Sequence, residues 1–492
     1  MKYWIKRRLT LALSGILACL GAGLFALSYS GCVGNTARTE LAVAPCNCAA
    51  ISVKFGPFVP GDAFIFGSQA NADCFAWSEF VALNWPSASG AGFGDPGDKG
   101  PVQWETYMPS DVLYNKDGTA PPRWGSTLIP RAFAGRMSLL GLPQTTKILH
   151  FSSKFEDVPV GSMRFATGQA FPMDEPSWLG AQNGTNVWYE ILVNKDIYDY
   201  VVRTHFYDAR AQVDSAHIGV PVNFPAGMWD PDNKGVTGAI ELKAAWMEVK
   251  DPGNAKWNRF KLSQAEVQDA NTGQMRTVTV ALVGLHILHK TAQQPSWVWA
   301  TFEQVDNVPG SPGTNGDYSF YNDHCALTMV NVHPGCAADG KTGRVGVDCP
   351  PNVHPPYYLC AGGPGPFPIQ LTRVTDLDAT VKQYNQLMQG AIRDRNSKSV
   401  WQYYELVNVL WSNGAQPISK DTTSAPFQLS TALMQPPVGN PVANTTMESY
   451  IQKTVCTDCH TSARIAPIPG DTMKTFSDFS FIIGTAGASR RY

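Results

Sequence analysis

Alternation of apolar and polar residues predicts a chain built mainly from strands between about residues 100 and 310. Candidate strands, each bounded by turn-forming residues, lie at 187–193, 239–249, 277–288 and 297–302. Both sides of the 277–288 segment are largely apolar. A strand of that kind is expected at the centre of a sheet that is covered on both faces.

Helical periodicity occurs at fewer places. The segment 73–85 has a wide apolar face and ends before Pro86, and helical patterns recur at 379–394, 399–410 and 445–453. Together these patterns predict an α+β fold. We expect a large β-rich domain with a few helices over residues 51–430, followed by a small helical segment at 431–492 that carries the candidate cofactor site described below.

Composition agrees with a folded chain and narrows the class of partner. Of the 492 residues, 44% are hydrophobic and 16% are charged, so the chain can bury a sizeable core. The net charge is −2, from 38 basic and 40 acidic residues. This balance argues against a nucleic-acid-binding protein, and we expect no nucleic-acid partner.

The N-terminus has the pattern of a targeting segment. Four basic residues within the first eight precede an uncharged, mostly apolar stretch that continues to about residue 27. Cys32 then follows Ser-Gly, as at the end of a bacterial lipoprotein signal, although Tyr29 stands where Leu is usual. Ordinary signal cleavage and a retained membrane anchor are the alternatives. We expect residues 1–32 to be a signal peptide or lipoprotein leader and 33–50 to be a tether.

This leader predicts an extracytoplasmic location, in the periplasm or at the cell surface of a bacterium, with the protein tethered to the membrane. Cysteine usage agrees, because a Gly- and Pro-rich excursion at about 309–368 holds four cysteines that would form two disulfides in an oxidising compartment. They are Cys325, Cys336, Cys349 and Cys360. A zinc site with His324, His333 and His354 is the alternative, but the spacing is irregular. Cys46, Cys48 and Cys74 allow one further bridge.

The strongest chemical signal is the run Cys456-Thr457-Asp458-Cys459-His460. C-x-x-C-H is the spacing of covalent c-type haem attachment: Cys456 and Cys459 can each form a thioether, and His460 can ligate the iron from the proximal side. A redox disulfide and half of a zinc site are the alternatives. The first lacks a βαβ context and the second lacks a nearby second Cys/His pair. We predict one covalently bound haem c.

The distal iron ligand is an open question in the sequence. Only 32 residues follow His460, too few to enclose a haem, so the large domain is expected to supply one wall of the pocket. His286, on an apolar strand followed by Trp297, Trp299 and Phe302, and Met473 are the main candidate distal ligands. Met447 and His289 are further candidates.

Several runs resemble an uncharacterised bacterial family of monohaem cytochrome c proteins with a C-terminal C-x-x-C-H motif. They are FVALNWP at 80–86, GLHI at 284–287, WVWATFE at 297–303, ANTTME at 443–448 and DFSF at 478–481. The resemblance spans most of the chain after the leader. It implies a secreted monohaem protein and does not identify a substrate.

The sequence therefore predicts an extracytoplasmic monohaem c-type cytochrome that binds haem and transfers electrons. Its partner would be a redox protein or a small-molecule electron donor or acceptor. The size of the large domain leaves two alternatives open. One is a haem-dependent oxidoreductase (an oxidase, peroxidase or oxygenase) with an open distal site, and the other is a surface binding module with an accessory haem.

Overall fold

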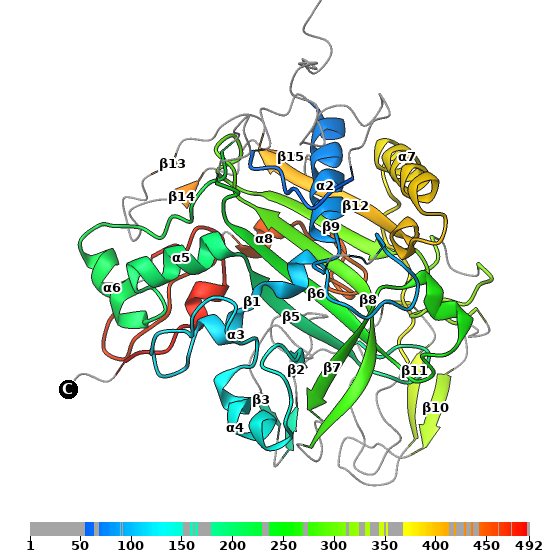
Figure 1. The fold of residues 1–492 in the computed structure, drawn as a ribbon, viewed down its shortest axis with the longest axis horizontal. Coiled ribbons are helices and arrows are strands. Elements are labelled where there is room, and N and C mark those ends of the chain that lie inside the picture. Colours follow the sequence, from blue (N-terminus) through cyan, green and yellow to red (C-terminus); the bar gives the residue numbers. More distant parts are fainter. Residues whose placement is uncertain are drawn as a thin grey trace, which may run out of the picture.

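A curled sheet of nine strands forms the middle of the protein (Figure 1). The strand order is β1-β5-β6-β8-β9-β12-β15, with β7 also beside β8 and β2 beside β7. Every pairing is antiparallel except β2 with β7. The strands are β1 Met108–Pro109, β2 Ile148–Leu149, β5 Val187–Val193, β6 Ile240–Val249, β7 Leu262–Gln268, β8 Met275–His289, β9 Val298–Gln304, β12 Tyr404–Ser412 and β15 Met434–Gln435.

The computed structural model describes residues 55–62, 68–88, 90, 92–150, 158–160, 163–165, 179–228, 236–268, 274–310, 314–323, 330–334, 344–348, 351–352, 368–412, 418–419, 428–429, 434–435, 442–460, 462–473 and 475–489. The predicted leader and tether lie outside these residues. So do the four cysteines of the 309–368 excursion.

Helices surround the sheet. They are α2 Gln69–Leu83, α3 Ser110–Leu113, α4 Arg131–Leu139, α5 Lys195–Thr204, α6 Ala209–His217, α7 Ala379–Arg395 and α8 Cys456–His460, with 3-10 turns η2 Gln103–Thr106, η3 Ala255–Arg259, η4 Val400–Tyr403 and η5 Ile482–Thr485. Three small hairpins stand apart from the sheet: β3 Val158–Val160 with β4 Met163–Phe165, β10 Val330–Pro334 with β11 Arg344–Asp348, and β13 Ile418–Ser419 with β14 Gln428–Leu429.

The expected mixture of helices and sheet is confirmed, and several elements lie where the sequence places them. Strand β5 has the predicted bounds, and β6, β8 and β9 each begin or end within two residues of them. Strand β8 is central, since β6 pairs along one edge while β9 and β7 share the other. Helices α2 and α7 match the two longest helical patterns.

Two helix predictions are wrong. The 399–410 segment forms only the short turn η4 and then strand β12, because its alternating apolar residues pair with β9 along most of their length. Residues 445–453 form turns instead of a helix. Here the Asn444 side chain accepts from the backbone N–H and hydroxyl of Thr446, and Glu303 accepts from the Thr445 backbone, so these groups are bonded outside a helical ladder.

The sheet has two differently covered faces. We call the side covered by α2 and α7 the helical face; it includes Trp246, Leu285 and Phe302 and forms one large apolar cluster. We call the opposite side the C-terminal face, because residues 442–489 pack against it. Trp299 and Ile483 share one cluster there, and Ala245 and Met447 share another. In Figure 1, α2 crosses in front of the strands and α8 lies behind them.

Candidate haem-attachment site

Helix α8 consists of the C-x-x-C-H motif alone. Its single turn places Cys456 and Cys459, three residues apart, on the same side of the helix. Both thiols are half-buried and neither is in a disulfide. The turn therefore presents two thiols together, beside His460, in the arrangement that double thioether attachment needs.

His460 is oriented by a backbone carbonyl. Its Nδ1 lies 2.7 Å from the carbonyl oxygen of Phe479. Because a carbonyl only accepts, Nδ1 carries the proton, and in the neutral imidazole the lone pair is then on Nε2. Histidines that ligate metals commonly donate their other ring N–H to a carbonyl in this way, which fixes the tautomer and the plane of the ring.

Aromatic side chains surround the imidazole. The Trp299 ring meets it edge-on, with centroids 4.8 Å apart and planes at 69°. Phe481 lies against it at 5.0 Å and 65°. Trp299 comes from strand β9, so the sheet supplies one side of the surroundings of His460. These rings form an apolar surface suited to a porphyrin edge.

Residues 477–481, which we call the His460 strap, follow an unusual backbone path. Asp478 and Phe479 have φ of 54° and 66°, and the adjacent Trp297 has φ of 68°. Left-handed backbone at residues other than glycine costs about 1–3 kcal/mol each and is concentrated at functional sites. The path turns the Phe479 carbonyl toward His460.

Buried polar contacts hold the strap. The Asp478 carboxylate accepts from Lys290 Nζ at 2.5 Å and from the Phe224 backbone N–H at 2.9 Å. Trp297 Nε1 donates to the Asp478 carbonyl at 3.1 Å. Burial raises the pKa of Asp478 even though Lys290 opposes that shift. Two residues after Asp478, the Ser480 hydroxyl donates to Glu241 at 2.6 Å.

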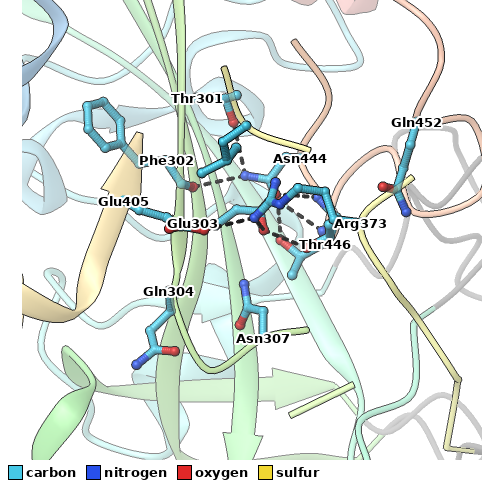
Figure 2. A network of polar contacts seen from close by, with 12 residues as sticks. Thr301, Phe302, Glu303, Gln304, Asn307, Arg373, Glu405, Asn444, Thr446 and Gln452 are labelled. Atoms are coloured by element: carbon cyan, nitrogen blue, oxygen red, sulfur yellow. Dashed lines mark hydrogen bonds and ion pairs between the residues drawn. The ribbon is translucent and has the colours of Figure 1, made fainter. Parts of the chain in front are cut away.

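A second buried network fixes residues 442–449, which we call the approach segment because they lead into the motif (Figure 2). Asn444 donates to Thr301 Oγ1 at 3.0 Å and to the Phe302 carbonyl at 2.9 Å. Glu303 accepts from the backbone N–H and the hydroxyl of Thr445 at 2.5 and 2.6 Å. These bonds join the approach segment to strand β9.

Arg373 lies between Glu303 and Glu405 of β12, and its guanidinium nitrogen is 3.2 Å from the Glu303 carboxylate and 2.9 Å from the Glu405 carboxylate. Although burial opposes the charge, the two carboxylates raise the pKa of Arg373. Burial raises the pKa of Glu405, with Arg373 opposing. Glu303 therefore joins the segment to the sheet. The nearby Asp306 is outside this network and is bound to Arg259, at 2.5 and 2.7 Å.

The two main candidate distal ligands lie on the His460 side of the sheet. Met473 packs against the cluster that Cys456 and Trp299 also join. His286 is cross-strand from Thr301 on the C-terminal face, and its Nε2 lies 3.2 Å from Glu448 of the approach segment. The side chains of this pair are 12% and 20% exposed, so the pair is not sealed in the core.

The other candidate distal ligands lie elsewhere. His289 lies on the helical face, where its Nδ1 is paired with Glu79 and its Nε2 lies 2.6 Å from the Thr237 carbonyl. Both ring nitrogens of His289 are therefore hydrogen-bonded to other groups in the core. Met447 is buried in the separate cluster that contains Tyr189. Phe302, grouped with Trp299 in the sequence, points to the helical face and stacks on Phe80 at 4.3 Å.

Three further observations bear on the sequence predictions. Cys74 on α2 is disulfide-bonded. Across the described ranges, no three His, Cys, Asp or Glu side chains are grouped to hold a metal ion. In that same part of the chain, no helix has the length and hydrophobicity needed to cross a bilayer.

The sequence identified the motif but not its immediate surroundings. Phe481 and the Phe479 carbonyl belong to the DFSF run, which only the resemblance singled out. Because a backbone carbonyl has no residue preference, no local signal indicated the bond to His460.

Comparison with protein families, curated proteins and solved structures finds no match to this chain.

Proposed function

We propose that the protein is a monohaem c-type cytochrome that transfers electrons outside the cytoplasm. The observation that carries this proposal is the His460 Nδ1 bond to Phe479, made on the same turn that presents Cys456 and Cys459. A histidine that donates its Nδ1–H to a carbonyl leaves Nε2 as the nitrogen available to ligate a metal. The donor set of two thiols and one oriented imidazole is the one that haem c requires.

The residues of the site have separate roles in this proposal. Cys456 and Cys459 would hold the cofactor covalently, and His460 would be its proximal ligand through Nε2. Trp299 and Phe481 would exclude water from that side. Bound haem supplies a centre that accepts and releases one electron, and the sheet and the covering segment keep its surroundings rigid. Its partner would be a redox protein or a small-molecule donor or acceptor.

The proposed division of labour follows the sequence prediction. Residues 51–430 would form the large β-rich domain, and residues 431–492 would be the haem-attachment segment, whose first part adds strand β15 to the sheet. The packing of residues 442–489 over the C-terminal face supports this proposal. The disulfide at Cys74 supports an oxidising compartment, and the leader pattern at 1–32 supports export with a lipid or membrane anchor.

The test is covalent haem content after expression with a haem-attachment system. We expect the wild-type protein to retain haem in a denaturing gel, and the Cys456→Ala/Cys459→Ala variant to lose it. His460→Ala should lose the reduced spectrum of the wild type. His205→Ala, which changes an exposed histidine whose ring is hydrogen-bonded to Tyr207, is the control. Wild-type protein without covalent haem would refute the proposal.

One observation favours a haem-dependent oxidoreductase as the second candidate. The partly exposed His286–Glu448 pair lies on the same sheet face as Trp299, and a histidine bound to a carboxylate can serve in proton transfer. Carbon monoxide distinguishes the two functions. A spectrum unchanged by carbon monoxide favours electron transfer, whereas ready binding favours the enzyme.

A further inference from the structure

We propose that Asp478 is a positioning residue that sets the reduction potential of the haem through the Phe479 carbonyl and His460. This inference rests on the proposed function and deepens it. Asp478 would not touch the cofactor. Its role would be to hold the strap in the one conformation that directs the adjacent carbonyl at the axial histidine.

The backbone geometry makes such a residue necessary. Two consecutive left-handed residues, Asp478 and Phe479, are needed to bring the carbonyl to 2.7 Å from His460 Nδ1. Aspartate tolerates this conformation because its short side chain can bond locally, but phenylalanine does not favour it. The strap would therefore relax to ordinary backbone angles unless other contacts opposed the change.

Those contacts converge on Asp478. Its carboxylate binds Lys290, whose side chain is 4% exposed, and the Phe224 backbone, while its carbonyl accepts from Trp297. Trp297 has its own left-handed backbone and is two residues from Trp299, which packs on His460. The residue that donates to the Asp478 carbonyl and the residue that packs on His460 thus lie in the same short stretch of the chain.

The expected consequence is electronic. A short bond from Nδ1–H to a fixed carbonyl makes the imidazole a stronger electron donor, which favours ferric over ferrous iron and lowers the reduction potential. If the strap relaxes, this bond lengthens and the potential rises. The bonds that hold Asp478 in place would therefore affect the reduction potential separately from the charge of its carboxylate.

The experiment compares haem-loaded wild type with Asp478→Asn and Asp478→Ala. Asparagine removes the charge but keeps an acceptor and tolerates the left-handed conformation, whereas alanine removes all side-chain anchors. We expect alanine to raise the ratio of reduced to oxidised protein about tenfold at a fixed potential, which is about 59 mV for one electron. The shift for asparagine should be smaller. Asp199→Ala, from an exposed pair with Lys195, is the control.

A second readout reports on the bond itself. In 15N-histidine-labelled protein, solvent exchange of the His460 Nδ1 proton should accelerate in Asp478→Ala and stay slow in Asp478→Asn. If alanine prevents folding, Lys290→Met/Asp478→Asn removes the ion pair without leaving a buried charge, and a rise in potential with faster exchange is expected.

The two proposals fail in different ways. Wild-type protein without covalent haem would overturn the proposed function. Haem-loaded Asp478→Ala, or the double variant in its place, with wild-type potential and exchange would overturn the role of Asp478 and leave the function intact. Equal reduction potentials in the alanine and asparagine variants, with slow exchange in both, would show that Asp478 affects the potential only through its charge. That result would also overturn the positioning role of Asp478.

Discussion

The two faces of the central sheet are covered by different means. On the helical face, α2 places Trp77 and Phe80 against Phe302, with ring centroids 5.1 and 4.3 Å apart. Burial of apolar surface is the main stabilising contribution there. On the C-terminal face, helices α5 and α6 share the apolar cluster of Trp299, whereas residues 442–489 have little helix and add individual side-chain hydrogen bonds to their apolar contacts.

The difference shows how a site can be placed on an otherwise ordinary core. Helices need only an apolar stripe, so many sequences could cover the helical face. The approach segment and the His460 strap depend on individual acceptors, chiefly Asn444, Glu303 and Asp478. Directional contacts of this kind hold a backbone in one position, as a binding or catalytic site requires.

The largest expected effect comes from Arg373→Met on the C-terminal face. The substitution leaves the carboxylates of Glu303 and Glu405 without their buried cation, and breaking such a pair costs about 3–5 kcal/mol. Urea unfolding measures the loss. In contrast, Arg131→Met breaks an exposed pair with Asp117 and should cost less than about 1 kcal/mol. Equal losses would show that the approach segment does not depend on this network.

A pH-dependent effect of similar size is expected on the helical face. Burial raises the pKa of Asp73 to about 7, opposed by its bond to Gln69. The folded state therefore favours the protonated acid, and its free energy of unfolding falls as pH rises from about 4 to about 7. Asp73→Asn should abolish this fall, a gain on the order of 4 kcal/mol at pH 8 and almost none at pH 3.

Thermal unfolding of Asp73→Asn and wild type across this pH range gives the comparison. Asp199→Asn, at an exposed position, should follow the wild-type curve. Parallel curves for wild type and Asp73→Asn would contradict the assignment.

The smallest of the three effects compares two glycines. A Cβ at Gly284 would overlap the Thr446 hydroxyl and lie 2.9 Å from Asn444 Oδ1, so Gly284→Ala should displace the approach segment and cost about 1–3 kcal/mol. Gly390 lies in α7 with open space around it, and Gly390→Ala should stabilise by up to about 1 kcal/mol. Stabilisation by both substitutions would argue against close packing on the C-terminal face.

The sequence was informative where one local pattern dominated. Strand β5 and helix α7 follow from period-two and helical patterns of their own residues. Strand β12 was missed because its apolar residues also fit a helix, and only pairing with β9 decides between the two. The Thr445 region was missed because its helical pattern is overridden by side-chain bonds to a residue 142 positions earlier, Glu303.

The candidate site could be located from the sequence, whereas its surroundings could not. Cys456, Cys459 and His460 are adjacent in the chain, so their spacing alone indicates attachment chemistry. Trp299 could be suspected from its apolar strand, although the alternation of a strand already separates it from Phe302. The Phe479 carbonyl reaches His460 only through the left-handed backbone of the strap. The residue types aspartate and phenylalanine do not predict that conformation.

The order of elements along the chain also has a consequence in time. Every strand of the central sheet, from β1 to β15, precedes Cys456. During synthesis from the N-terminus, the whole sheet is available to fold before the two thiols emerge. On the proposed function, covalent attachment would then compete with the docking of the approach segment and the His460 strap onto the sheet. The rate at which Asn444 and Asp478 form their bonds to the sheet would decide how long the thiols stay accessible to an attachment enzyme.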